Sequence, residues 1–317
     1  MLNDAMEPIA DCIERELAQP VADSVRAAAD ELRRRHGDAV AAILFYGSCL
    51  RDREDRDRVL DFYVVVDRYR DYHGRLHWAV LNKLLPPNVY YLAMGYEDRT
   101  IRAKYAVISL DHLRHATSRR ALMPTLWARF SQPCALIYRR DEASAEKVRS
   151  ALLAAIETTA GAALPLMPER FTARDLWRRV FQESYRTEFR AERSNRPDQL
   201  IDPYADRYRM LTETLLAAGR LPGCTALEGG EIARPPNGLQ RTVTRAAWWL
   251  RRLTGKILHP LRLIKSAFTF QGGLDYVLWK IEKHSGIKTE PTDWQRRHPV
   301  MAAPLLAWRL KRQGAFR

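Results

Sequence analysis

The first 140 residues alternate between apolar runs and polar, turn-forming segments, as is typical of an α/β domain. Residues 8–35 carry apolar side chains at helical spacing and stop before Gly37, which predicts a helix. Further helices are expected at residues 74–85 and 110–130, the second with a kink at Pro124. The runs that predict strands are AVAAILFY at 39–46, VLDFYVVV at 59–66, VYYLAM at 89–94, AKYAVIS at 103–109 and CALIY at 134–138.

From residue 143 onward the pattern changes to successive helices, with no further strand of comparable strength. These helices are predicted at residues 143–160, 172–193 and 203–219, before a Pro- and Gly-containing linker ends at residue 238. We therefore expect an α/β domain over residues 1–142, a helical domain over 143–232 and a basic amphipathic C-terminal region over 233–317.

The positive charge of the chain is concentrated in that last region. The formal net charge is +14, and residues 241–317 contain sixteen basic and four acidic residues, so they supply twelve of those charges. This distribution predicts an anionic partner, either nucleic acid or the headgroup layer of a membrane.

The composition of residues 241–265 favours the membrane, because Trp, Leu and Ile residues alternate with Arg and Lys residues. At a membrane surface, indole rings lie at headgroup depth and cations bind lipid phosphates. Single-stranded RNA binding has little use for so many Leu and Ile residues. A helix packed on its own protein with a solvated basic face is the alternative. Pro260 predicts two shorter helical pieces. The predicted membrane-binding residues are Trp248, Trp249, Arg251, Arg252 and Lys256.

Composition and termini exclude several classes of protein. The four cysteines form no C-x-x-C pair, which argues against a zinc ribbon, a redox motif or a disulfide framework and indicates a cytosolic compartment. The acidic N-terminus lacks the apolar stretch of a secretory signal, and no run reaches the roughly 20 apolar residues of a spanning helix. We expect a soluble or peripheral protein.

A Gly-Ser turn followed by an acidic strand is the candidate site. Gly47 and Ser48 follow the first apolar strand, and Asp61 lies near the start of the second. A glycine lets the backbone approach a triphosphate, whose phosphates the amides, the hydroxyl and the next helix N-terminus can hold. A carboxylate on the neighbouring strand can bind Mg2+ on the same phosphates. The arrangement resembles the nucleotidyltransferase superfamily (DNA polymerase β type), which implies a mixed sheet.

The second carboxylate of that superfamily's Asp-x-Asp pattern is missing. Neither the residue two before Asp61 nor the residue two after it is acidic. Asp67 shares the same face of a regular strand, but at about 3.3 Å per residue it lies roughly 20 Å away. Asp67 can supply the second ligand if the strand ends early, and otherwise a loop acid, Asp55 or Asp57, supplies it.

A closer resemblance covers residues 40–138. The segments YGSCL, LDFYVVVDRYRDYH, AKYAVISLDHL and ARFSQPCALIY are similar, in this order, to the mitochondrial-type phosphatidate cytidylyltransferases (the translocator assembly and maintenance family). The chain departs from that family at Tyr72, Ala106 and Gln132, where the family has Trp, Gly and Lys. The residues that fall on the family's landmarks are Gly47, Ser48, Asp61, Asp67, His73, Lys104 and Arg129.

The resemblance implies transfer of a cytidylyl group from CTP to phosphatidic acid, which gives CDP-diacylglycerol and pyrophosphate with Mg2+ as cofactor. Because the lipid phosphate is already an anion, the reaction needs cations around the phosphates rather than a strong general base. The implied roles are catalysis for Asp61 and Lys104, nucleotide binding for Tyr46, Gly47, Ser48, Lys104 and Arg129, and metal binding for Asp61 and Asp67.

The expected partners are CTP, phosphatidic acid and an anionic membrane surface, with no nucleic acid. Two alternatives stay open: a nucleotidyltransferase that acts on RNA or a protein hydroxyl, and a non-enzymatic membrane-associated scaffold. A high arginine content, few lysines and the absence of an organelle transit sequence predict a bacterial, cytoplasmic protein, peripheral on the inner face of the membrane.

Overall fold

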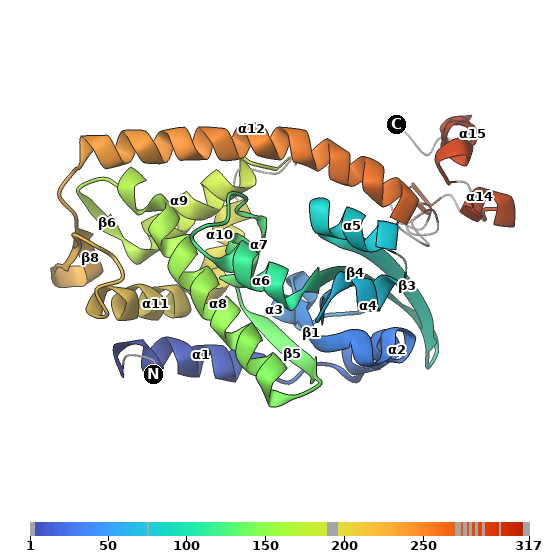
Figure 1. Cartoon of the computed structure of the whole chain (residues 1–317), viewed down its shortest axis with the longest axis horizontal. Coiled ribbons are helices and arrows are strands. Elements are labelled where there is room, and N and C mark those ends of the chain that lie inside the picture. The colour runs from blue at the N-terminus through green and yellow to red at the C-terminus, as the bar shows by residue number, and fades with distance from the viewer. Residues whose placement is uncertain are drawn as a thin grey trace.

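The computed structural model shows a mixed sheet covered by helices, with one long helix running across the molecule (Figure 1). It describes residues 4–74, 76–188 and 196–269, and in the C-terminal part residues 274, 278, 281–282, 285–286, 289–297 and 299–312.

The central sheet has five strands in the order β3-β4-β2-β1-β5. Strands β2 and β4 are parallel, and the other neighbours are antiparallel. All five predicted strands are confirmed, because each is a buried run that pairs on at least one side. Their bounds are Val40–Tyr46 (β1), Val59–Val66 (β2), Asn88–Tyr96 (β3), Arg99–Ser109 (β4) and Cys134–Arg139 (β5).

The helices of the first 140 residues are shorter than the sequence predicted. The predicted helix 8–35 is wrong as one element, since the chain breaks around Pro20 into two helices. The predicted helix 110–130 is also two helices, because residues 118–124 leave the helical path before Pro124. The helices are α1 (Glu7–Leu17), α2 (Asp23–His36), α3 (Ser48–Asp52), α4 (Tyr69–His73), α5 (Leu76–Leu84), α6 (Leu110–Thr117) and α7 (Thr125–Phe130), with 3-10 turns at Asp4–Met6 and Gly37–Ala39.

The middle of the chain is helical, as predicted, but it also contains a small sheet of order β6-β8-β7. These strands were not predicted, because two or three residues are too few to show a period. The elements are α8 (Glu142–Ala163), η3 (Leu164–Leu166), β6 (Arg170–Thr172), α9 (Ala173–Tyr185), α10 (Arg196–Ile201), η4 (Asp202–Tyr204), α11 (Ala205–Ala217), β7 (Thr225–Ala226), η5 (Glu228–Gly230) and β8 (Glu231–Ala233). The last residues of the predicted helix 172–193 lie outside the described part.

Two hydrophobic clusters sandwich the sheet. On one face, Phe62 and Val64 of β2 pack with residues of α2. On the other face, Tyr63 and Val65 join a cluster that includes Trp127 of α7 and residues of α1, α8, α9 and α11. Asp61 has the same strand parity as Tyr63, so it lies on the face covered by α7 to α9. The cluster joins the predicted first and second domains, whose boundaries remain a prediction.

The basic segment forms a single helix, α12 (Gly238–Thr269), with Pro260 inside it. The prediction of two shorter pieces is wrong. The missing N–H of Pro260 weakens one turn, but contacts on both sides hold the helix in place. Trp248 is buried and donates its indole N–H to the Ala162 carbonyl over 3.1 Å, and Lys265 donates to the Pro87 carbonyl over 3.1 Å. Helices α14 (Asp293–Arg297) and α15 (Pro299–Arg312) follow.

Candidate functional site

Three neighbouring strands bring the predicted site residues together. Tyr46, the last residue of β1, pairs with Asp61 of β2, and Asp61 pairs with Lys104 of β4. The Gly47-Ser48 turn therefore starts beside Asp61, and the sheet register fixes this arrangement.

Gly47 is the residue that allows the close approach. Its backbone has φ 94° and ψ −159°, a conformation that L-residues rarely adopt. A Cβ on Gly47 would lie 3.1 Å from Oδ2 of Asp61, closer than ordinary van der Waals contact. Ser48 then begins α3. A side chain at Gly47 would force the Asp61 carboxylate to shift by a few tenths of an ångström, and the turn places this carboxylate against the backbone that would hold a phosphate.

Lys104 and Asp61 form an ion pair with Nζ and Oδ1 3.3 Å apart. The two side chains are 37% and 25% exposed, so solvent screens the pair, and it contributes at most about 1 kcal/mol to folding. Both groups therefore remain accessible to a ligand, one as a cation and one as a carboxylate.

Arg129 of α7 supplies a second positive charge. Its guanidinium lies over the Tyr46 ring, 5.0 Å from the centroid. Burial lowers the pKa of Arg129, but Tyr46, Tyr63 and Asp61 outweigh that effect and raise the pKa overall, so the group stays charged. Among the described carboxylates, Asp61 acts on Arg129 electrostatically, without an ion pair between the two side chains. A half-buried cation near a single carboxylate is suited to an anionic ligand.

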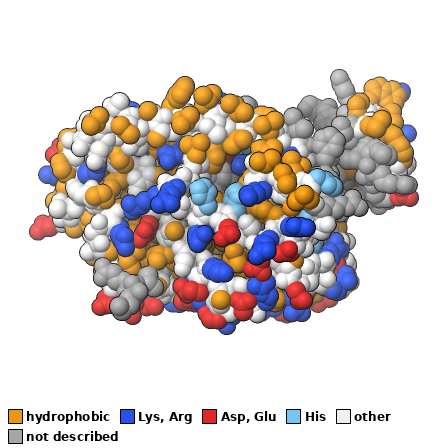
Figure 2. Space-filling view, in the orientation of Figure 1, with side chains coloured by type: hydrophobic (Ala, Val, Ile, Leu, Met, Phe, Trp, Pro, Cys, Tyr) orange, Lys and Arg blue, Asp and Glu red, His pale blue; other side chains and the backbone are white. Residues whose placement is uncertain are grey.

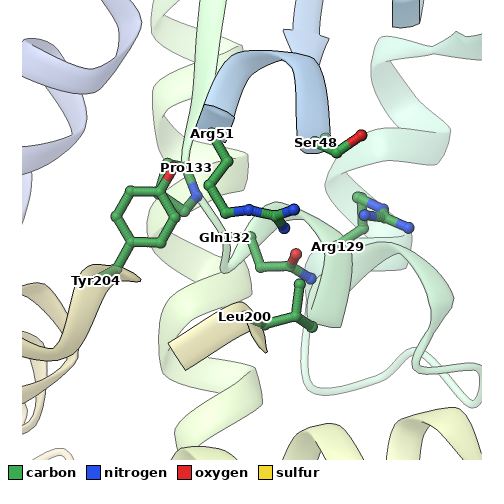
Figure 3. Close-up of a pocket in the computed structure, with 8 residues that line it drawn as sticks. Ser48, Arg51, Arg129, Gln132, Pro133, Leu200 and Tyr204 are labelled. Atoms are coloured by element: carbon green, nitrogen blue, oxygen red, sulfur yellow. The ribbon is translucent and has the colours of Figure 1, made fainter. Parts of the chain in front are cut away.

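A small cavity opens beside the turn (Figure 3). In Figure 3 the Arg51 and Gln132 side chains extend toward Arg129, and Tyr204 stands on the other side. The sequence missed Arg51, although its place three residues after Ser48 on the same short helix was a usable signal. Tyr204 comes from a turn far along the chain, so no local pattern indicated it. The lining is Gly47, Ser48, Arg51, Arg129, Gln132, Pro133, Leu200 and Tyr204.

The structure does not bring Asp67 to this site. The prediction that Asp67 binds the metal together with Asp61 is therefore wrong. Strand β2 runs without interruption to Val66, which pairs with Val40 and Ser109 at the opposite edge of the sheet. Asp67 is bound there by Arg140, with Nη1 and Oδ2 2.5 Å apart. A regular strand keeps the two carboxylates roughly 20 Å apart.

The loop acid Asp55 does not join Asp61 either. Its Oδ2 accepts a hydrogen bond of 2.8 Å from Arg99 and another from Ser24. It lines a separate cavity with Pro20 and Val25. Among the described residues there is no group of three or more His, Cys, Asp or Glu side chains that could hold a metal ion.

Asp61 alone still fits a magnesium ion that arrives with a nucleotide. Mg2+ retains several water molecules and is commonly bound by one or two carboxylates together with substrate phosphates. A single carboxylate beside a phosphate-binding turn matches that donor set, whereas a preformed protein cage does not exist in the described part of the chain.

His73 lies in a buried polar network apart from the cavity lining. Its Nε2 is 3.2 Å from the Asn82 amide nitrogen and 3.5 Å from that of Asn88. Burial, with a smaller contribution from Lys265, lowers the pKa of His73 to about 4, so the ring is neutral at pH 7. Its place here indicates a role in packing α4 and α5 against β3.

Three of the five predicted membrane residues hold α12 on the protein. Trp248 is only 1% exposed and packs edge-on against Trp127, so its predicted membrane contact is corrected. Arg252 donates to Glu183 over 3.1 Å, and Arg251 donates to the Leu122 carbonyl over 3.0 Å. Their polar groups are engaged because they lie on the sides of the helix that face the protein.

The opposite side of α12 is apolar and exposed. Trp249 is 61% exposed, and Lys256 is exposed beside it. Figure 2 shows hydrophobic side chains along the edge of the molecule that α12 occupies in Figure 1. We call this set the outer face of α12; it comprises Leu239, Val243, Trp249, Leu250, Leu253, Ile257 and Leu261. The composition of the segment is readable from the sequence, but which of its residues face outward is not.

Comparison with known proteins identifies a family. A family model described as "Phosphatidate cytidylyltransferase, mitochondrial" matches residues 34–220, which include the sheet, the Gly-Ser turn and every residue that lines the cavity. A search of curated proteins finds no relative.

Proposed function

We propose that Gly47, Ser48, Asp61, Lys104 and Arg129 form the CTP site of this protein. The chain belongs to the mitochondrial-type phosphatidate cytidylyltransferase family, because the family model matches more than half of the length of the chain. The family makes CDP-diacylglycerol from CTP and phosphatidate. Neither RNA, nor a protein hydroxyl, nor a scaffold role is needed to account for the chain. The fold and this activity agree with what the sequence predicted.

The observation that carries the residue assignment is the meeting of the turn, Asp61 and Arg129. A Cβ on Gly47 would lie only 3.1 Å from Asp61 Oδ2, and Arg129, on which Asp61 acts electrostatically, lines the cavity beside the turn. Cations and a carboxylate around a glycine turn are the groups that bind a nucleotide triphosphate.

In the reaction, an oxygen of the phosphatidate phosphate attacks the α-phosphorus of CTP. The new P–O bond forms as the bond between the α-phosphorus and the bridging oxygen breaks, and pyrophosphate leaves with that electron pair. Arg129, Arg51 and Lys104 offset negative charge on the phosphates, and the Gly47-Ser48 amides orient them. When bound, Mg2+ would be held by Asp61 and would neutralise charge on the leaving pyrophosphate.

Metal removal should abolish turnover without unfolding the protein. With radiolabelled CTP and detergent-dispersed phosphatidate, we expect EDTA to lower CDP-diacylglycerol formation at least about a hundredfold and added Mg2+ to restore it. The melting temperature should not change, since the described residues hold no preformed metal cluster. Full turnover in EDTA would show that Asp61 acts without a metal.

We further propose that the outer face of α12 docks on a lipid surface. No helix in the described stretches is both long and apolar enough to cross a bilayer. Trp249 and the exposed aliphatic side chains instead suit insertion to headgroup depth, with Lys256 near lipid phosphates. This helix lies beyond the segment that the family model matches, so the proposal stands on exposure and composition alone.

The double variant Leu253→Glu, Ile257→Glu should lose most binding to anionic vesicles. The two side chains are 43% and 57% exposed, so the fold should tolerate the change. Loss of about 1 kcal/mol or more of apolar burial per residue, with added repulsion, predicts a 10- to 100-fold lower partition coefficient in vesicle sedimentation. Leu227→Glu, at an exposed leucine outside α12, is the matched control. Equal sedimentation of all three proteins would refute the docking face.

The location in the cell follows from this docking. We propose a peripheral association with an anionic membrane. The cytoplasmic face of a bacterial membrane remains a prediction. The family description names mitochondria instead of bacteria.

A further inference from the structure

Helix α5 carries an exposed apolar stripe that is separate from the outer face of α12. Leu76, Val80 and Leu84 are 65%, 46% and 71% exposed. Because they are spaced by four residues, their side chains lie one above the other on one side of the helix. The other side packs on the protein through the buried residues Ala79 and Asn82. We call Leu76, Val80 and Leu84 the α5 stripe.

The polar contacts of Asn82 hold α5 in this orientation. Its side-chain carbonyl accepts a hydrogen bond of 2.8 Å from the backbone N–H of Asn88, and its amide nitrogen is 3.2 Å from Nε2 of His73. Rotation of α5 about its axis would break both contacts and leave buried polar groups unpaired, which is costly. The α5 stripe therefore faces outward as a fixed feature of the fold.

The residues that flank the α5 stripe complement an anionic surface. At about 100° per residue, Lys83 and His77 lie roughly 60° to either side of Val80. Both are exposed, and α5 contains no Asp or Glu. A lysine beside exposed leucines can lay its stem along the apolar surface while its ammonium group reaches a lipid phosphate. Apolar side chains with a flanking cation and no acid are typical of a helix that lies in a membrane interface.

The α5 stripe adjoins the outer face of α12. Lys265, which is buried, donates hydrogen bonds to the carbonyls of Leu85 and Pro87, directly after α5. Leu261 of the outer face is one turn before this anchor. Figure 2 shows hydrophobic side chains gathered below the α12 edge, where Figure 1 places α5. The two apolar surfaces are therefore neighbours, and their relative position is fixed by the Lys265 contacts.

We propose that the α5 stripe inserts into the same anionic lipid surface as the outer face of α12 and so sets the orientation of the protein on the membrane. The inference rests on the docking proposed for α12 and goes beyond it. A single helix in the interface leaves the protein free to roll about the axis of that helix. A second apolar stripe beside it removes this freedom, because only one orientation buries both, and the two contacts strengthen each other.

A fluorophore on α5 tests the insertion directly. Val80→Cys is labelled with nitrobenzoxadiazole in a Cys224→Ser background, since the other three cysteines are buried. On addition of phosphatidylglycerol-containing vesicles, we expect the emission to shift to shorter wavelength and to gain intensity as the label leaves water. The same label at Leu227→Cys, an exposed position outside both helices, should show no shift. Unshifted emission at Val80 in protein that sediments with the vesicles would overturn the inference.

Neutral substitutions in the α5 stripe separate apolar insertion from charge. Leu76→Ser with Leu84→Ser should lower the partition coefficient about tenfold or more on both neutral and anionic vesicles, because apolar burial is lost while the charge is unchanged. Lys83→Ala should weaken binding to anionic vesicles alone. Leu227→Ser is the matched control and should bind like the wild type. Equal partitioning of the double serine variant and the wild type would refute a role for α5.

These measurements distinguish α5 from α12 and from the catalytic site. If Leu253→Glu, Ile257→Glu loses vesicle binding and the double serine variant does not, α12 docks and the inference about α5 fails. The label and the sedimentation need no turnover, so absent CDP-diacylglycerol synthesis by the wild type would refute the proposed function alone. A second copy of the chain is the other possible occupant. A dimer that the double serine variant converts to monomer, with vesicle binding unchanged, would contradict the proposal.

Discussion

Asp61→Asn is expected to lower kcat at least about a thousandfold while the protein remains folded. The carboxylate lies against the Gly-Ser turn and is the proposed metal ligand, so its loss removes that ligand. Stability should change little, because the ion pair with Lys104 is partly exposed and contributes at most about 1 kcal/mol. Turnover with labelled CTP and the melting temperature measure the two effects separately.

Asp67→Asn is the matched control for that experiment. It removes a carboxylate from the same strand, but at the edge where Asp67 binds Arg140, away from the cavity. We expect wild-type turnover and a small loss of stability. A similar loss of turnover in both variants would restore the metal role that the sequence predicted for Asp67 and would contradict the site described above.

Gly47→Ala is expected to lower kcat/KM about a hundredfold or more. An alanine at φ 94° carries a backbone penalty of roughly 1–3 kcal/mol. Its Cβ would also lie 3.1 Å from Asp61 Oδ2 and would displace the carboxylate from the turn. The Asp61 carboxylate would have to shift by a few tenths of an ångström and the strained backbone would also move, so both the carboxylate and the phosphate-binding turn would be misplaced.

Gly37→Ala separates the backbone penalty from the displacement of Asp61. Gly37 has φ 56° and ψ −143°, and a Cβ there meets nothing within 4 Å. Both variants should therefore lose stability, as measured by chemical denaturation, but only Gly47→Ala should lose activity. Equal kcat/KM values for the two variants would show that the close approach of Gly47 to Asp61 has no catalytic role.

The two sides of the long helix α12 are chemically distinct. The inner side places Trp248 against Trp127, which is two residues before Arg129 on α7. The outer side exposes Trp249, Leu253 and Ile257. The same element thus supports the helix that carries Arg129 and, in our proposal, offers a surface to lipid that would keep the site close to a membrane-bound substrate.

The sequence alone determined the strands, the turn and the region of positive charge. Runs such as VLDFYVVV are readable because burial on both faces of a strand requires continuous apolar residues. Gly47-Ser48 and Asp61 were found because their chemistry is local: a glycine before a helix and an acid at a strand start. The resemblance to the family rested on the order of these segments, and the family match confirms it.

Only the tertiary structure decided which side chains of these elements meet. Trp248 and Trp249 are adjacent and chemically identical, but Trp127, which is 121 residues earlier than Trp248, buries one and leaves the other exposed. The uninterrupted β2 excluded Asp67, and a turn from the helical region added Tyr204 to the cavity. Periodicity along a chain specifies an element and its possible faces. Which of these faces is buried depends on residues that are distant in the sequence, because they form the surface against which the element packs.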